Sequence, residues 1–221
     1  MINTTSSFSL LEIFQMGGPL MWPLLLFSIA AVSITIERAI YIFYHDLKLS
    51  DLKAVVEEAL ADGNVEEAIP FLESLTKRRM GARILLALVK RHNLSEHKLE
   101  KVVETEAMSC VSSLESGFSF LIALGSIAPL TGFLGTTTGM ITAFKSIAEA
   151  VDVNAQIVAS GIYEALVTTV FGLIIAIVAM AAHSIFTNKV DKFTSEVEVV
   201  CSDLIFSITE AAAEAVTESA K

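Results

Sequence analysis

Charge is missing from three long stretches of this 221-residue chain. No Asp, Glu, Lys or Arg occurs in Pro19–Ile36, Gly117–Phe144 or Ala165–Asn188, which are 18, 28 and 24 residues long. The rest of the chain carries the usual soluble share of charged residues, about 26%. Each stretch is long enough to cross a hydrocarbon layer of about 30 Å as a helix. The sequence therefore predicts three membrane spans and excludes a protein that consists only of a soluble enzyme.

Other features that a ligand or an enzyme requires are also scarce. The net charge of −10 leaves no basic surface for nucleic acid. Cys110 and Cys201 are too few for a disulfide framework, and we expect both to be small buried hydrophobes. There is no P-loop and no dinucleotide-binding glycine motif. The four histidines lack the spacing of metal ligands; they are His45, His92, His97 and His183. We expect no enzyme activity, no cofactor and no metal.

The distribution of Lys and Arg predicts the orientation. Residues 1–36 contain none, 37–116 contain eleven, 117–164 contain one and 187–221 contain three. The positive-inside rule then places the N-terminus outside and the C-terminus inside. The expected segments are a periplasmic leader 1–16, a first span 17–36, a cytoplasmic helical region 37–116, a second span 117–144, a periplasmic connection 145–161, a third span 162–188 and a cytoplasmic helical tail 189–221. The first span is not a signal peptide, because no Lys or Arg precedes it and no small-residue cleavage site follows it.

The cytoplasmic segments have helical periodicity. Apolar residues at spacings of three and four run from Leu99 to Leu121, which predicts one long helix continuing into the second span. The tail has a similar stripe that must pack against other helices; it comprises Phe186, Val190, Phe193, Val197, Val200, Leu204, Ile208, Ala211 and Ala215. The basic run 77–79 is interpreted as a solvated turn, with contact to anionic lipid as the alternative. The predicted fold is an all-α membrane protein with long cytoplasmic helical extensions.

The last two spans each carry one face of small residues. In the second span these are Gly125, Pro129, Gly132, Thr136, Gly139 and Ala143, and in the third Ala165, Thr169, Gly172, Ala176, Ala179 and His183. Such faces let helix backbones approach closely, so tight packing is one interpretation. The threonines favour a polar surface shared between helices or with a guest; they are Thr136, Thr137, Thr138, Thr142, Thr168 and Thr169. Packing and an ion pathway both stay open.

Two titratable residues border the third span. Glu164 lies at its outer end and is either a functional carboxylate or an interfacial one in contact with water. His183 lies near the inner end, where a packing or hydrogen-bonding role is favoured over proton relay. No acidic residue sits in the middle of any span. Ion transport through hydrocarbon normally needs one there, so another polypeptide is expected to supply it.

Three motifs together resemble those of the ExbB/TolQ/MotA proton-channel family, and ExbB and TolQ most closely. The first is the run Gly-Gly-Pro-Leu-Met-Trp-Pro at 17–23, with Ile-Glu-Arg at 36–38 closing the span. The second is Gly-Ser-Ile-Ala-Pro-Leu-Thr-Gly-Phe-Leu-Gly-Thr at 125–136. The third is Gly-Ile-Tyr-Glu-Ala-Leu-Val-Thr-Thr at 161–169, followed by Gly172. With the order of one span, a long inner loop, two spans and an inner tail, the resemblance extends over most of the chain.

The resemblance implies a pentameric ring in the bacterial inner membrane, around single-span partners of the ExbD/TolR type that contribute a membrane Asp. Ion flow past that Asp would drive mechanical work on the envelope, with a transducer of the TonB/TolA type as a further partner. Thr136 and Thr169 match the family's pore-lining threonines, and Glu164 matches its third-span glutamate. Thr137, Thr138, Thr168, His183, Gly132, Gly139 and Gly172 are second-rank pathway or packing candidates.

Three alternatives remain. Thr137 and Thr138 stand where the family commonly has an apolar or aromatic pair, so a sodium-driven member is conceivable. A non-conducting membrane scaffold would use the small faces for packing alone. A secondary transporter would need inverted repeats and broken helices, and three unpaired spans disfavour it.

Overall fold

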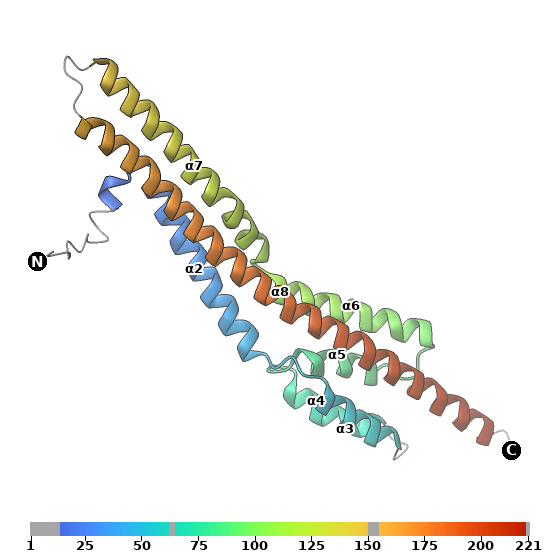
Figure 1. Ribbon diagram of the computed structural model, residues 1–221. Helices are drawn as coiled ribbons and strands as arrows, with labels where there is room; N and C mark the ends of the chain where they lie inside the picture. The colour runs from blue at the N-terminus through green and yellow to red at the C-terminus, as the bar shows by residue number, and fades with distance from the viewer. Residues whose placement is uncertain (1–13, 62–64, 150–154, 220–221) are drawn as a thin grey trace, which may run out of the picture. The chain divides into compact units, whose positions relative to one another are not determined.

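The computed structural model describes residues 14–61, 65–149 and 155–219, and every regular element within these ranges is a helix. Figure 1 shows them in chain order. They are α2 (Met21–Tyr44), α3 (Ser50–Ala61), the short 3₁₀ helix η1 (Val65–Ala68), α4 (Ile69–Leu75), α5 (Met80–Val89), α6 (Glu96–Glu115), α7 (Phe118–Glu149) and α8 (Ala155–Ser219). The predicted all-helical fold is confirmed for the described part of the chain.

Three helical runs are long and apolar enough to cross a membrane. They are Met21–Tyr44, Glu96–Glu149 and Ala159–Ala211. The first begins just after Pro19 and tolerates Pro23, because a proline in the first turn of a helix interrupts no intrahelical hydrogen bond. The prediction of three apolar spans is confirmed by helix length and composition.

One prediction about the helices is wrong. The apolar periodicity from Leu99 to Leu121 suggested a single uninterrupted helix, but α6 ends at Glu115 and α7 begins at Phe118. Ser116 has an extended ψ of 130°, and Gly117 has a φ of 85°. A positive φ suits glycine and interrupts the helix, while the apolar stripe simply continues on the other side of the break.

The chain divides into two compact units, and α2 and α8 contribute to both. The first unit, residues 1–37 and 117–184, contains most of α2, all of α7 and the first half of α8. Within it α7 and α8 lie side by side (Figure 1), and glycine, alanine and threonine make many of the close contacts between them. Many large apolar side chains of this unit are exposed instead, Leu130 and Phe133 among them. This distribution is typical of a membrane unit, where lipid and neighbouring subunits cover the outside.

The second unit, residues 38–116 and 185–221, has an ordinary apolar core. Leucines from α3, α4, α5 and α6 are fully buried in it; they include Leu52, Leu72, Leu85, Leu88, Leu99 and Leu114. The tail stripe of α8 is buried from Phe186 to Ile208, as predicted. Ala211 is exposed, which corrects the end of the predicted stripe, and the side chain of Ala215 lies outside the described residues.

Both cysteines are free and buried in the second unit, as expected. Burial raises the pKa of the Cys110 thiol and raises that of Cys201 to about 12. Because the thiolate is the reactive form, both thiols are chemically quiet in the folded chain.

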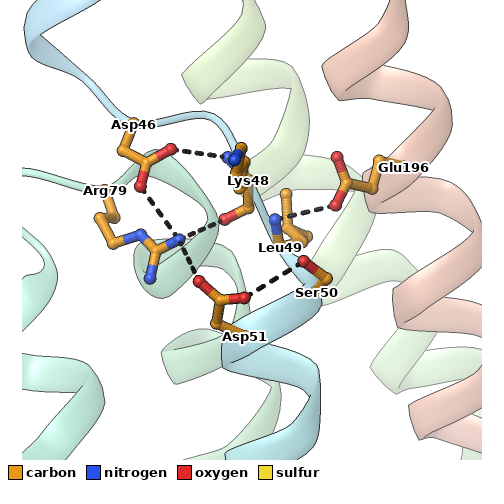
Figure 2. Close-up of polar contacts among 7 residues, drawn as sticks. All are labelled: Asp46, Lys48, Leu49, Ser50, Asp51, Arg79 and Glu196. Atoms are coloured by element: carbon orange, nitrogen blue, oxygen red, sulfur yellow. Dashed lines mark hydrogen bonds and ion pairs between the residues drawn. The ribbon is translucent and has the colours of Figure 1, made fainter.

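The segment between α2 and α3 is fastened by polar contacts (Figure 2). The guanidinium of Arg79 lies 3.2 Å from a carboxylate oxygen of Asp46 and 3.6 Å from one of Asp51. It also donates to the carbonyl of Lys48 at 2.9 Å. The amide of Leu49 donates to the Glu196 carboxylate of α8 at 2.9 Å. This short segment is therefore held to both α5 and α8.

Arg79 does not behave as part of a solvated basic turn. Its side chain is only 12% exposed and is paired with two aspartates. Lys77 and Arg78 are exposed, as the prediction of a solvated turn required. The basic run thus divides into one inward-facing ion-pairing residue and two surface residues.

Candidate functional site

The seam between α7 and α8 is built from glycines that face backbone. A Cβ at Gly132 would lie 2.8 Å from the Thr168 carbonyl oxygen, and one at Gly172 would lie 2.5 Å from the Ala128 carbonyl oxygen. One at Gly139 would lie 3.2 Å from the Gly161 carbonyl oxygen. At Gly132 and Gly172 no larger residue fits unless a helix moves, and at Gly139 the contact would be tight, so these three glycines serve close helix packing in this chain.

The hydroxyls of Thr136 and Thr169 meet across this seam. They form a short hydrogen bond to each other, and both lie near the Gly132 carbonyl, at 3.2 Å from Thr136 and 3.1 Å from Thr169. The Thr169 hydroxyl also lies 3.4 Å from the Ala165 carbonyl of its own helix. Each hydroxyl has one proton, so two protons serve four contacts and at most two of these bonds form at once. The cluster therefore has more than one proton arrangement and keeps acceptor capacity for a further donor. Both side chains are half-buried.

Thr168 reaches the same two carbonyls as its neighbour Thr169, with the Gly132 oxygen at 3.4 Å, but it is more deeply buried. It is buried, with 1% of its surface exposed, and its hydroxyl donates to the Ala165 carbonyl at 2.8 Å. A Cβ at Gly135 would overlap this hydroxyl, at 2.2 Å. Thr168 fills the space that Gly135 leaves, which is a packing role.

The remaining threonines of α7 do not join the cluster. Thr137 and Thr138 are exposed and both donate to the Leu134 carbonyl of their own helix, at 2.8 and 2.9 Å. Thr142 is exposed as well and donates to the Thr138 carbonyl at 3.0 Å. Within the chain the structure brings Thr136 and Thr169 together and leaves these three on another face, so the six threonines do not form one surface between α7 and α8.

Glu164 lies apart from the two threonines. Its side chain is half-buried and rests against Gly18, in the turn that precedes α2. A Cβ at Gly18 would be 1.8 Å from a Glu164 carboxylate oxygen. The sequence analysis did not connect these residues. The glycine pair before Pro19 was the only local signal, and it carries no information about a partner 146 positions away.

His183 lies at the other end of the first unit. Its half-buried ring packs edge-on against Phe118, with the ring centroids 5.7 Å apart. This contact agrees with the packing role favoured from the sequence. Among residues 14–61, 65–149 and 155–219, no group of three His, Cys, Asp or Glu side chains comes together as a metal site.

Comparison with known proteins identifies the family. The model of the MotA/TolQ/ExbB proton channel family matches residues 71–199. The ExbB-like 1 biopolymer transport protein of Synechocystis sp. is 33% identical over 203 residues, covering 86% of this chain and 78% of that protein. Biopolymer transport protein exbB1 of Vibrio cholerae is 28% identical over 196 residues, covering 86% of this chain and 84% of that protein.

A shorter match links the chain to TolQ. The Tol-Pal system protein TolQ of Haemophilus influenzae is 37% identical over 81 residues, which is 37% of this chain and 36% of that protein. The family match covers more than half of the chain, and the Synechocystis relative matches over most of both lengths. The chain, with its three apolar spans and its α7–α8 seam, therefore belongs to the MotA/TolQ/ExbB proton channel family.

Proposed function

We propose that this chain is the ring-forming subunit of an ion-driven motor in the bacterial inner membrane. The observation that supports this proposal is the cluster of oxygen atoms from Thr136, Thr169 and Gly132, which lies in the charge-free stretches of α7 and α8. It offers hydrogen-bond donors and acceptors to a guest but has no group that binds and releases an ion on its own. The chain therefore works with a second polypeptide that supplies the carboxylate.

The partner is a single-span protein of the ExbD/TolR type, enclosed by a homopentamer of this chain. Family membership supports this assembly, and so do the exposed large apolar side chains of the membrane unit, which leave room for neighbouring subunits. Ion flow past the partner's Asp moves the enclosed helices against the ring. A transducer of the TonB/TolA type passes that movement to the envelope. The excess of Lys and Arg in residues 37–116 supports a periplasmic N-terminus and a cytoplasmic C-terminus.

The test replaces Thr136 and Thr169 by valine, singly and together. Valine keeps the shape of threonine and removes the hydroxyl. The chain is co-expressed with a single-span partner, reconstituted in vesicles, and ion flux is followed with a pH-sensitive dye under an imposed gradient. We expect the double variant to lose most of the flux, whereas Thr142→Val, whose hydroxyl bonds only its own helix, keeps it.

Assembly is checked in the same samples by native mass spectrometry, where a homopentamer is expected for every variant. Full flux in an intact double variant would contradict the proposal and favour a non-conducting scaffold. Repeating the flux assay with sodium or with potassium as the only metal cation separates a proton-driven motor from a sodium-driven one. A proton-driven motor gives the same flux in both.

A further inference from the structure

The turn at Gly17 and Gly18 closes directly onto Glu164 of α8. An atom added at the Cβ position of Gly18 would lie 1.8 Å from the carboxylate oxygen and 2.7 Å from the carboxylate carbon of Glu164. The added Cβ is bonded to the Gly18 Cα, so the carboxylate already lies against the backbone of the turn. It occupies the volume that any side chain at position 18 would need.

Two independent features of the structure therefore require glycine at position 18. Its φ is 69°, a left-handed backbone that suits glycine and costs other residues about 1–2 kcal/mol. Its missing side chain is also what admits the carboxylate. A chain turn by itself would require only the positive φ. The missing side chain at position 18 is an additional requirement, which comes from the contact with Glu164.

Two other glycines each share one of these two features with Gly18 and therefore serve as controls. Gly117 has a similar φ of 85° and precedes Phe118, which packs against His183, roughly five turns of α8 away from Glu164. Gly17 belongs to the same turn as Gly18, but a Cβ there would meet the Met21 side chain, at 2.4 Å from its Cγ, and Val167 at 3.3 Å, and not the Glu164 carboxylate. Gly117 thus shares with Gly18 only the positive φ. Gly17 shares with Gly18 only the lack of space for a side chain.

We propose that Gly18 is a positioning residue for Glu164: it holds the carboxylate against the turn before α2. This inference rests on the proposed function for its consequence, since Glu164 belongs to the ion pathway only if the chain is a motor subunit. The contact itself does not depend on that. A glutamate side chain has several rotatable bonds, and confining it against the turn fixes where its carboxyl group lies.

The test measures how fast Glu164 reacts with dicyclohexylcarbodiimide, an apolar reagent for carboxyl groups, in the purified full chain. Labelling is quantified by peptide mass spectrometry relative to Glu149, whose side chain is 69% exposed. We expect Gly18→Ala to raise the Glu164 to Glu149 ratio severalfold, because the displaced carboxylate leaves the turn that shields it. Gly17→Ala and Gly117→Ala keep the wild-type ratio.

An unchanged ratio in Gly18→Ala, or an equal rise in either control, overturns the proposal. If Gly18→Ala lowers the yield of folded protein, the double variant Gly18→Ala with Glu164→Ala shows whether a clash with the carboxylate is the cause. A double variant that folds with the same yield as Glu164→Ala alone supports the proposal. A double variant whose yield stays low overturns the proposal. The labelling needs neither partner nor ion gradient, so its result is independent of the flux assay on Thr136 and Thr169.

Discussion

At the residue scale, Gly172 and Gly125 both lie in the α7–α8 seam but face different kinds of atom. A Cβ at Gly172 would meet the Ala128 carbonyl oxygen at 2.5 Å, and one at Gly125 would meet the Met180 Cγ at 2.6 Å. Backbone cannot withdraw, whereas a methionine side chain can change rotamer. We expect Gly172→Ala to destabilise the chain by about 1–3 kcal/mol and Gly125→Ala by clearly less. Thermal unfolding in detergent compares the two, and equal losses would contradict the assignment.

Cys201 gives a pH-dependent prediction. Its thiol pKa is raised from 9.0 to about 12 by burial. Between these values the unfolded thiol has lost its proton while the folded one keeps it. The folded state then binds more protons, so stability falls as the pH rises, with a slope of up to about 1.4 kcal/mol per pH unit. Stability curves from pH 8 to pH 11 should fall less steeply in Cys201→Ala than in the wild type; parallel curves would refute this.

The threonine pair could be predicted from sequence, but the Gly18 contact could not. Thr136 and Thr169 each lie on a regular stripe of small residues, and two such stripes on neighbouring helices are expected to face each other. Sequence spacing placed Thr169 on the stripe and Thr168 beside it, but it did not indicate that Thr168 is the more deeply buried of the two. The contact between Gly18 and Glu164 depends on how a turn returns to a distant helix, which no local pattern encodes.

At the element scale, the segment between α2 and α3 depends on Arg79. Its guanidinium pairs with Asp46 and Asp51 and donates to the Lys48 carbonyl, and its Nε–H is buried with no acceptor among the described residues. Arg79→Met removes all of these bonds while keeping the length of the side chain. We expect a loss of about 1–3 kcal/mol, because three contacts of a largely buried guanidinium are lost and nothing replaces them.

Arg83 provides the matched control for that experiment. It pairs with Glu106 at 2.6 Å, but its side chain is 46% exposed. Exposed ion pairs contribute at most about 1 kcal/mol, so Arg83→Met should be nearly neutral in the same thermal unfolding assay. Comparable losses from Arg79→Met and Arg83→Met would show that the segment is not fastened by Arg79.

The helices themselves were predictable where apolar periodicity and burial coincide. The stripe of α8 from Phe186 to Ile208 is buried as expected, because an amphipathic helix in water has to cover its apolar face. The break at Ser116 and Gly117 was missed, since one glycine without proline is a weak stop signal and the stripe continues across it. Pro70 lies in the first turn of α4, where proline is tolerated.

At the scale of the whole molecule, the two units differ in their content of Lys and Arg. Residues 117–184 hold a single Lys or Arg, whereas residues 38–116 hold eleven. The second unit also buries leucines as a water-soluble core does, and the first exposes large apolar residues. One chain therefore combines a unit suited to lipid with a unit suited to water. The asymmetry of Lys and Arg predicts on which side of the membrane the second unit lies.

That orientation is tested with single cysteines in a Cys110→Ala, Cys201→Ala background. Glu149→Cys and His97→Cys both lie on exposed side chains, 69% and 94% accessible. A maleimide that cannot cross membranes should label position 149 in cells with a permeable outer membrane, and position 97 only after the inner membrane is opened. The reason is the cost of moving the eleven Lys and Arg residues of 37–116 across the membrane against the inside-negative potential. Labelling of position 97 in closed cells would invert the topology and move Glu164 to the cytoplasmic side.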